Sequence, residues 1–180
     1  MPIPNPYFKN VPGFGDLKME QVIVDYVYPL LSVLRNESGR RFLCMCFDTR
    51  GAQKWLVTPI STQVLSALLK NEVTLSSPFE DPHTLKMRIV MNYDTRHELF
   101  QMLSAKQIPT EELPEPGEYL DADPGEWAEY IKLLNLVRPR QTFDSEVHRA
   151  AVHYGGTKET ANVKWRNSTQ QHRREGRYVV

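Results

Sequence analysis

The sequence predicts an α+β domain, in which an antiparallel sheet of four to five strands has helices packed on one face, followed by a basic C-terminal extension. The first observation is that runs rich in β-branched and aromatic residues, separated by short turn sequences, fill residues 20–60. The second is that segments with helical periodicity come after them. The third is an uneven distribution of charge. Residues 1–137 contain 13 Lys and Arg against 18 Asp and Glu, whereas residues 138–180 contain 9 against 4.

The chain length sets the domain organisation. A chain of 180 residues has room for one ordinary domain and an appendage, so we predict a single domain over residues 1–137 and a basic extension over residues 138–180. The first 15 residues hold four prolines and two glycines, which predicts an extended arm on the surface. No apolar run is long enough to cross a bilayer and the N-terminus does not resemble a signal peptide, so a cytoplasmic location is expected.

The strands of the predicted meander lie between residues 22 and 60. Residues 21–34 are typical of one long or bent strand, in which Pro29 marks an edge or a bulge. Turns at residues 36–39 and 50–51 then separate two further strands. A fourth strand is predicted over residues 85–93, where apolar side chains alternate with period two.

The middle strand of this meander contains both cysteines of the chain. Residues 42–47 are apolar on both faces, which predicts a central strand with a second layer over part of its other side. Cys44 and Cys46 would point to the same face, a poor geometry for a mutual disulfide, and we interpret them as small core side chains. His148 and His153 are five residues apart on a predicted helix, off the spacing that a zinc pair needs, so no metal site is predicted.

Helix signals follow the meander at four places. Ser61 can cap a helix that has a stripe of leucines, and Thr95 with Glu98 has the pattern of a capping box for another. The run from Asp123 to Glu126 is a strong helix start, and apolar residues recur after it at helical spacing. In the extension, residues 144–154 predict one short helix that is marginal on its own. Its apolar stripe consists of Val147, Ala150, Ala151 and Tyr154.

An aromatic-Asp-Thr-Arg pattern occurs twice, at residues 47–50 and 93–96, each time at the end of a predicted strand. In one interpretation the two loops share a rim of the sheet, where polar side chains recognise a ligand. Those side chains are Asp48, Arg50, Asp94 and Arg96. In the other interpretation Asp and Thr are there because they form turns and caps. A small enzyme with its site on this rim is the third hypothesis for function. The sequence has no phosphate-binding loop and no nucleophile elbow, so no catalytic residue and no cofactor are assigned.

Two charged segments suggest a binding function. Between Lys106 and Lys132 there is no basic residue but eight carboxylates, of which we single out Glu111, Glu112 and Glu115 as partner-binding residues. The distal tail interleaves cations with aromatic residues. Its candidate contact residues are Lys164, Trp165, Arg166, Arg173, Arg174, Arg177 and Tyr178. Such a tail suits an acidic protein surface, whereas phosphate contacts and base stacking would make it a nucleic-acid arm.

The stretch RRFLCMCFDTRGAQKWLVTPIS, with DYVYPLL before it, resembles small bacterial domains of an uncharacterised family over about residues 20–105. The resemblance implies a compact α+β domain of bacterial or phage origin and brings no catalytic residues with it. Our preferred hypothesis is a non-catalytic interaction module, such as an accessory, inhibitor, antitoxin or immunity-type subunit. It would bind another protein through the basic tail and the acidic loop. The alternative is a nucleic-acid-binding accessory protein.

Overall fold

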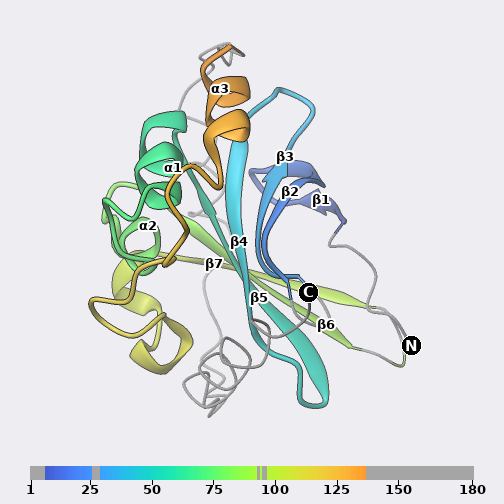
Figure 1. Cartoon of the computed structure of the whole chain (residues 1–180). Coiled ribbons are helices and arrows are strands. Elements are labelled where there is room, and N and C mark those ends of the chain that lie inside the picture. The colour runs from blue at the N-terminus through green and yellow to red at the C-terminus, as the bar shows by residue number, and fades with distance from the viewer. Residues whose placement is uncertain (1–6, 26–28, 93, 95–96, 137–180) are drawn as a thin grey trace.

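One antiparallel sheet of seven strands, arranged in the order of the sequence, makes up most of the structure (Figure 1). The computed structural model describes residues 7–25, 29–92, 94 and 97–136. The strands are β1 (Phe8–Val11), β2 (Gly15–Asp25), β3 (Pro29–Arg35), β4 (Arg41–Asp48), β5 (Ala52–Pro59), β6 (Lys86–Asn92) and β7 (Glu98–Leu103). The helices are α1 (Thr62–Leu69), α2 (Ser77–Glu80) and α3 (Ala128–Leu136), with two 3-10 turns, η1 (Ala105–Gln107) and η2 (Thr110–Glu112).

The predicted fold class is wrong. Instead of an α+β sheet of four to five strands with helices packed on one face, the chain forms a mostly β structure whose seven-stranded sheet curls towards a barrel. Three segments account for the difference. The predicted surface arm contributes β1, the predicted long strand is two strands, and the helix predicted after residue 95 is β7.

The N-terminal arm enters the core because it carries buried aromatic residues. Phe8 pairs with Leu17 of β2, and Phe8, Val11 and Phe14 are almost completely buried. Three apolar side chains at this spacing remove enough surface from water to hold the segment against the sheet. The prediction of a surface arm was therefore wrong for residues 8–14.

The segment predicted as one bent strand is an antiparallel pair. Asp25 at the end of β2 faces Pro29 at the start of β3, so Pro29 begins a strand instead of interrupting one. The β2–β3 ladder has three register shifts, between Met19 and Gln21, between Val22 and Val24, and between Val24 and Asp25. Such bulges bend a strand and increase its twist, and they fall where the sheet curls over.

Strand β7 lies where the capping pattern of Thr95 and Glu98 predicts a helix. Residues 98–103 pair with β6 along their whole length, with Ile89 opposite Phe100. The side chains of Phe100 and Met102 pack into the core with period two. A helix this short is marginal by itself, whereas the open edge of β6 offers a complete set of backbone partners. Tertiary pairing therefore prevails over the local helix signal.

Strand β4 is buried on both faces, as its composition predicts, and separates two apolar clusters. Leu43, Met45 and Phe47 belong to the cluster that α1, α3 and the loop segments cover. On the other face, the cover is the sheet itself, because β1 and β2 curl back until the Phe8 ring lies edge-on to Trp55 at 5.9 Å between ring centroids. Figure 1 shows this curl beside β4.

Two of the predicted helices are confirmed. The Ser61 hydroxyl accepts a hydrogen bond from the backbone N–H of Val64 and caps α1, whose leucines are buried. Helix α3 begins at Ala128, after turns that the Asp123–Glu126 signal starts, and Leu134 is its buried residue. Among the described residues, no helix is both long and apolar enough to cross a membrane.

Candidate functional site

The strand residues next to the two Asp-Thr-Arg segments lie at the same end of the sheet, since Ala52, after residues 47–50, pairs with Asn92, before residues 93–96. Asp48 is buried and points inward, where its carboxylate lies 3.2 Å from the Lys54 ammonium and accepts a hydrogen bond from the backbone N–H of Arg50. The Asp94 backbone N–H donates to the side chain of Asn92. Arg96 lies outside the described residues. Asp48 therefore stabilises its own turn, as the interpretation based on turn formation expects.

A second ion pair lies beside the first and fastens the acidic loop to the sheet. Arg88 on β6 donates from Nε and Nη2 to the Glu112 carboxylate, and from Nη1 to Gln101 on β7 at 3.1 Å. Only 1% of Glu112 is exposed. Burial raises the pKa of Glu112, while Arg88 and, more weakly, Lys54 oppose the shift. Glu112, which we predicted to contact a partner, instead holds η2 in place.

Lys86, the first residue of β6, stabilises the loop that precedes this strand. Its side chain is fully buried, and the ammonium donates hydrogen bonds to the backbone carbonyls of Asp81 and Thr84. Burial lowers the pKa of Lys86, and the nearby Asp81 opposes that shift. These carbonyls replace the water that a buried ammonium loses, so Lys86 stabilises the conformation of the loop.

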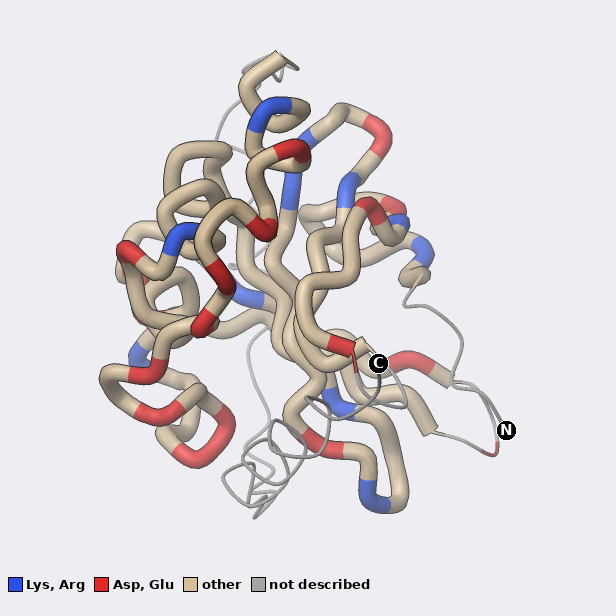
Figure 2. Tube along the Cα trace, in the orientation of Figure 1, with Lys and Arg blue, Asp and Glu red and all other residues tan. Residues whose placement is uncertain are grey.

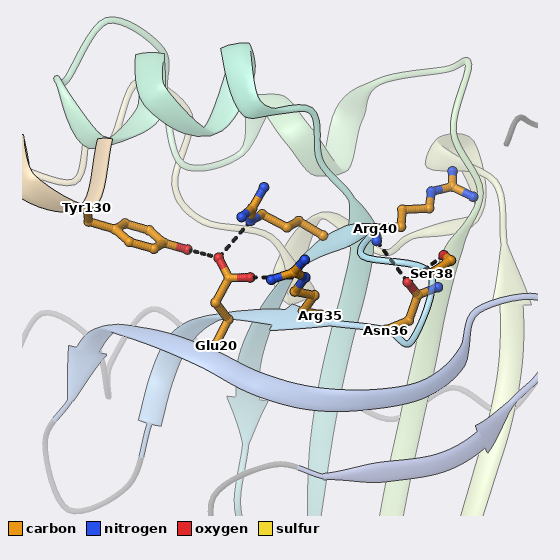
Figure 3. Close-up of polar contacts among 7 residues, drawn as sticks. Glu20, Arg35, Asn36, Ser38, Arg40 and Tyr130 are labelled. Atoms are coloured by element: carbon orange, nitrogen blue, oxygen red, sulfur yellow. Dashed lines mark hydrogen bonds and ion pairs between the residues drawn. The ribbon is translucent and has the colours of Figure 1, made fainter. Parts of the chain in front are cut away.

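The third charge network joins α3 to the sheet (Figure 3). The Glu20 carboxylate accepts hydrogen bonds from Arg41 Nε at 2.7 Å and from the Tyr130 hydroxyl at 2.8 Å, while Arg35 lies 3.8 Å from its second oxygen. Burial and the hydrogen bond to Glu20 raise the pKa of Tyr130 above its ordinary value. One carboxylate thus links β2, β3, β4 and α3.

Three cationic side chains on neighbouring strands lie in a row beside this network. Lys18, Arg35 and Arg41 face one another across β2, β3 and β4, and like charges in such positions repel. Glu20 offsets the repulsion between the two arginines. The turn that joins β3 to β4 is stabilised from within, because the Asn36 side chain accepts hydrogen bonds from the Ser38 hydroxyl and from the backbone N–H of Arg40 (Figure 3).

Gly39 closes this turn at φ +83°, and a Cβ on it would meet Arg35 Nη2 at 3.2 Å. We expect Gly39→Ala to lower the free energy of unfolding by about 1–2 kcal/mol, since an L side chain is strained at this φ. Gly51 is the matched control, because it has φ +73° with nothing within 4 Å of its Cβ position. Urea unfolding should show a larger loss for Gly39→Ala than for Gly51→Ala. Equal losses would show that the Arg35 contact has no energetic effect.

The acidic segment, residues 111–129, lies on the side of the molecule that carries the helices, where Figure 2 marks several Asp and Glu positions along the chain. Seven carboxylates remain between Lys106 and Lys132 once Glu112 is set aside. Glu111, Asp121, Asp123, Glu126 and Glu129 are exposed, and Glu115 and Glu118 are half-buried. The segment is held near its start by the Glu112–Arg88 pair, and near its middle by the Asn71 amide, which exchanges two hydrogen bonds with the backbone of Ala122. It is therefore a fixed acidic surface.

Both cysteines are buried in the core on the same face of β4, which confirms the prediction for them. Burial is the largest influence on each, raising the pKa of Cys46 to about 12 and that of Cys44 well above its ordinary value. Since the thiolate is the reactive form, both thiols should resist a thiol reagent such as DTNB at pH 8 in the folded protein. Both should react once the chain is unfolded in urea. Rapid labelling of the folded protein would contradict the buried assignment.

The candidate residues of the basic tail, from Lys164 to Tyr178, and the predicted helix at residues 144–154 lie outside the described residues. Within the described part of the chain, no three His, Cys, Asp or Glu side chains are grouped so that they could hold a metal ion.

Sequence reasoning missed the two networks that organise the charged residues. Arg88 and Glu112 are 24 positions apart, and Glu20 and Tyr130 are 110 apart. Arg88 alternates with apolar residues in β6, so its pattern indicates a solvent-facing position. The signal that could have indicated the pair was a charged residue, Arg88, within a mostly apolar strand. The sequence does not show that the loop with Glu112 passes over this strand.

The fold and these networks define a class of protein, namely a curled antiparallel sheet with a fixed acidic surface beside it. The chain belongs to DUF6575, a family of unknown function, which matches residues 7–157. The resemblance to an uncharacterised domain family is thereby confirmed, while a bacterial or phage origin stays a prediction. Neither the curated proteins nor the solved structures include a match to the chain.

Proposed function

We propose that this protein is a non-catalytic, cytoplasmic interaction module, an accessory, inhibitor, antitoxin or immunity-type subunit. It binds another protein through the acidic surface of residues 111–129 and the basic residues of its tail. The main support for this proposal is the acidic surface itself. Seven carboxylates follow one another without a Lys or Arg, on a segment that the Arg88–Glu112 pair fastens to the sheet.

A fixed charged surface suits protein recognition for two reasons. Charge complementarity accelerates encounter with an oppositely charged partner and disfavours partners of like charge. A segment that is already ordered loses little conformational entropy on binding. The acidic surface meets both conditions, because five of its seven carboxylates are exposed, while the Ala122 backbone and the Glu112 side chain anchor the segment.

Several of the other charged side chains of residues 7–136 form ion pairs within the fold, which agrees with a binding role for the acidic surface. Asp48 with Lys54, Arg88 with Glu112, and Glu20 with Arg41 each connect parts of the fold. The tail supplies the opposite charge, with nine Lys and Arg among residues 138–180. A protein partner with an acidic and a basic patch would engage both ends of this charge distribution.

The test is a pull-down from native lysate, with and without nuclease, read by mass spectrometry and nucleic-acid staining. Four forms are compared: the full chain, a chain that ends at Thr157, the double variant Glu111→Gln/Glu129→Gln, and the control Asp25→Asn/Glu37→Gln. The control neutralises two exposed carboxylates outside the acidic surface. We expect a stoichiometric protein on the full chain and on the control, indifferent to nuclease. Truncation should remove it, and the first double variant should weaken its binding severalfold at low salt.

Two results would overturn the proposal. Nucleic acid retained without protein, with steep salt dependence, would support the nucleic-acid-binding alternative. Empty results from all four forms would leave the rim near Asp48 and Arg50 as the place to look for a small ligand. In that case Arg50→Ala should abolish turnover without unfolding the chain.

A further inference from the structure

Strands β1, β2 and β3 carry cations on the face of the sheet that points away from the core between the curled strands. Phe8 pairs with Leu17 and both side chains are buried, so the neighbouring Lys9 and Lys18 point to the outer face. Lys18 in turn pairs with Arg35 of β3. Both lysines are exposed, and the Arg35 side chain is 42% exposed. We call Lys9, Lys18 and Arg35 the cationic face.

An aromatic ring brings the two lysines of the cationic face together. The ammonium groups of Lys9 and Lys18 lie 5.6 and 5.9 Å from the centroid of the Tyr7 ring. The Tyr7 hydroxyl donates to the Asp16 carboxylate at 3.4 Å, and this carboxylate also accepts a hydrogen bond from the backbone N–H of Asn10. The Tyr7 ring therefore stabilises two positive charges close to each other at the surface.

Carboxylates of the fold neutralise the cationic face only in part. Glu20 lies 3.8 Å from Arg35, but its closest contact is Arg41 Nε at 2.7 Å. Within residues 7–25, 29–92, 94 and 97–136, neither Lys9 nor Lys18 forms an ion pair. Cations directly opposite each other on adjacent strands destabilise a sheet, and a bound anion would remove the repulsion between Lys18 and Arg35. A local arrangement that lowers stability is typical of a functional surface.

The cationic face is next to the acidic surface, and the two surfaces meet at α3. The Tyr130 hydroxyl of α3 donates to Glu20, the carboxylate beside Arg35 (Figure 3). Glu129, the last carboxylate of the acidic surface, directly precedes Tyr130. The described part of the chain therefore presents opposite charges side by side, without a contribution from the tail.

The size of the cationic face limits what it can bind. Three neighbouring strands span about 10 Å, the length of about three extended residues. A nucleic-acid strand that continued beyond this length would meet the acidic surface, and residues 1–137 contain 18 Asp and Glu against 13 Lys and Arg. The Tyr7 ring is also already engaged by two ammonium groups instead of being presented to a base. A short acidic segment of a protein avoids both difficulties.

We propose that the cationic face binds a short segment of the protein partner that is rich in Asp and Glu, while the acidic surface binds a basic part of the same partner. Carboxylates of this segment contact the ammonium groups of Lys9 and Lys18 and the exposed part of Arg35. This assignment rests on the function proposed above, because it describes the partner of that function. It adds a contact to those of the acidic surface and the basic tail.

Lysine acetylation of the full chain, read by peptide mapping, tests the site without the partner. The probe is an oligoglutamate peptide, which is compared with oligoglutamine and with oligothymidylate of the same length. At low salt, oligoglutamate should slow the acetylation of Lys9 and Lys18 at least about threefold. Acetylation of Lys70 and Lys106, which are exposed elsewhere on the molecule, should be unchanged. Oligoglutamine should have no effect at any of the four lysines.

Three results of this experiment would overturn the proposal. Equal slowing at all four lysines would show general screening without a site. Slowing confined to Lys158 and Lys164 would show that the tail alone binds the acidic peptide. Stronger protection of Lys9 and Lys18 by oligothymidylate than by oligoglutamate would assign the cationic face to nucleic acid.

A pair of variants of the full chain extends the test to the partner. In the pull-down described above, Lys9→Gln/Lys18→Gln should weaken binding of the captured protein severalfold, whereas the control Lys70→Gln/Lys106→Gln should not. Both variants should keep the urea midpoint of the wild type, so that a loss of binding is not a loss of folding. Equal binding by the two variants would overturn the proposal. An empty pull-down with selective protection by oligoglutamate would contradict the proposed function alone and support the acidic-segment site.

Discussion

Replacing Arg88 with Met is expected to lower the free energy of unfolding by about 3–5 kcal/mol at neutral pH, because the buried carboxylate of Glu112 then has no cation beside it. The loss should be visible in urea unfolding followed by tryptophan fluorescence. The substitution should also loosen the acidic segment, since the hydrogen bonds from Arg88 to Glu112 tie η2 to β6.

The pH dependence of this loss identifies its cause. Burial already raises the pKa of Glu112, and Arg88 opposes that shift, so removing Arg88 raises the pKa further. A carboxyl whose pKa is higher in the folded state binds its proton more tightly there. Stability is therefore greatest below the unfolded pKa of about 4.3 and falls as the pH rises through the folded value. The deficit of Arg88→Met relative to the wild type should shrink as the pH is lowered into the acid range.

Two variants serve as controls. Arg88→Met/Glu112→Leu removes both charges and should be less destabilised than Arg88→Met alone, since no buried charge is left unpaired. Lys132→Met breaks the exposed Lys132–Glu129 pair and should have little effect. A deficit of Arg88→Met that stays constant with pH and equals that of the double variant would rule out the unpaired carboxylate as its cause.

Phe8→Ala is expected to lower the free energy of unfolding by about 3–5 kcal/mol, the usual cost of truncating a buried aromatic side chain. Phe8 packs edge-on against Trp55 and connects β1 to the far side of the curled sheet. Its loss removes the cover from the core face that also contains Cys44 and Cys46, so both thiols should become more reactive. Thermal unfolding and DTNB labelling measure the two effects.

The neighbouring residue is the matched control for this prediction. Tyr7 precedes β1 and is 42% exposed, and the ammonium groups of Lys9 and Lys18 lie over its ring. Tyr7→Ala should change stability far less than Phe8→Ala. If the two variants were equally mild, the N-terminal segment would be a surface arm, as its prolines alone suggest.

Several features of this protein follow from the sequence by itself. Ser61 and the leucines after it determine α1, the period-two alternation of residues 85–93 determines β6, and the apolar run at residues 42–47 determines a central strand. The acidic segment and the burial of Cys44 and Cys46 are equally local properties. In each case, the residues that carry the signal are neighbours along the chain, so propensity and periodicity report the outcome.

Only the tertiary structure decided the remaining features. The capping pattern of Thr95 and Glu98 predicts a helix, but residues 98–103 become β7 because β6 presents an open edge to them. Residues 8–11 form β1 because the curled sheet brings Trp55 within reach of Phe8. The Glu20–Tyr130 and Arg88–Glu112 pairs join segments that are far apart in sequence. These features depend on which segments pack against each other in the folded chain. The free energy of such a long-range contact cannot be deduced from the sequence of either segment alone.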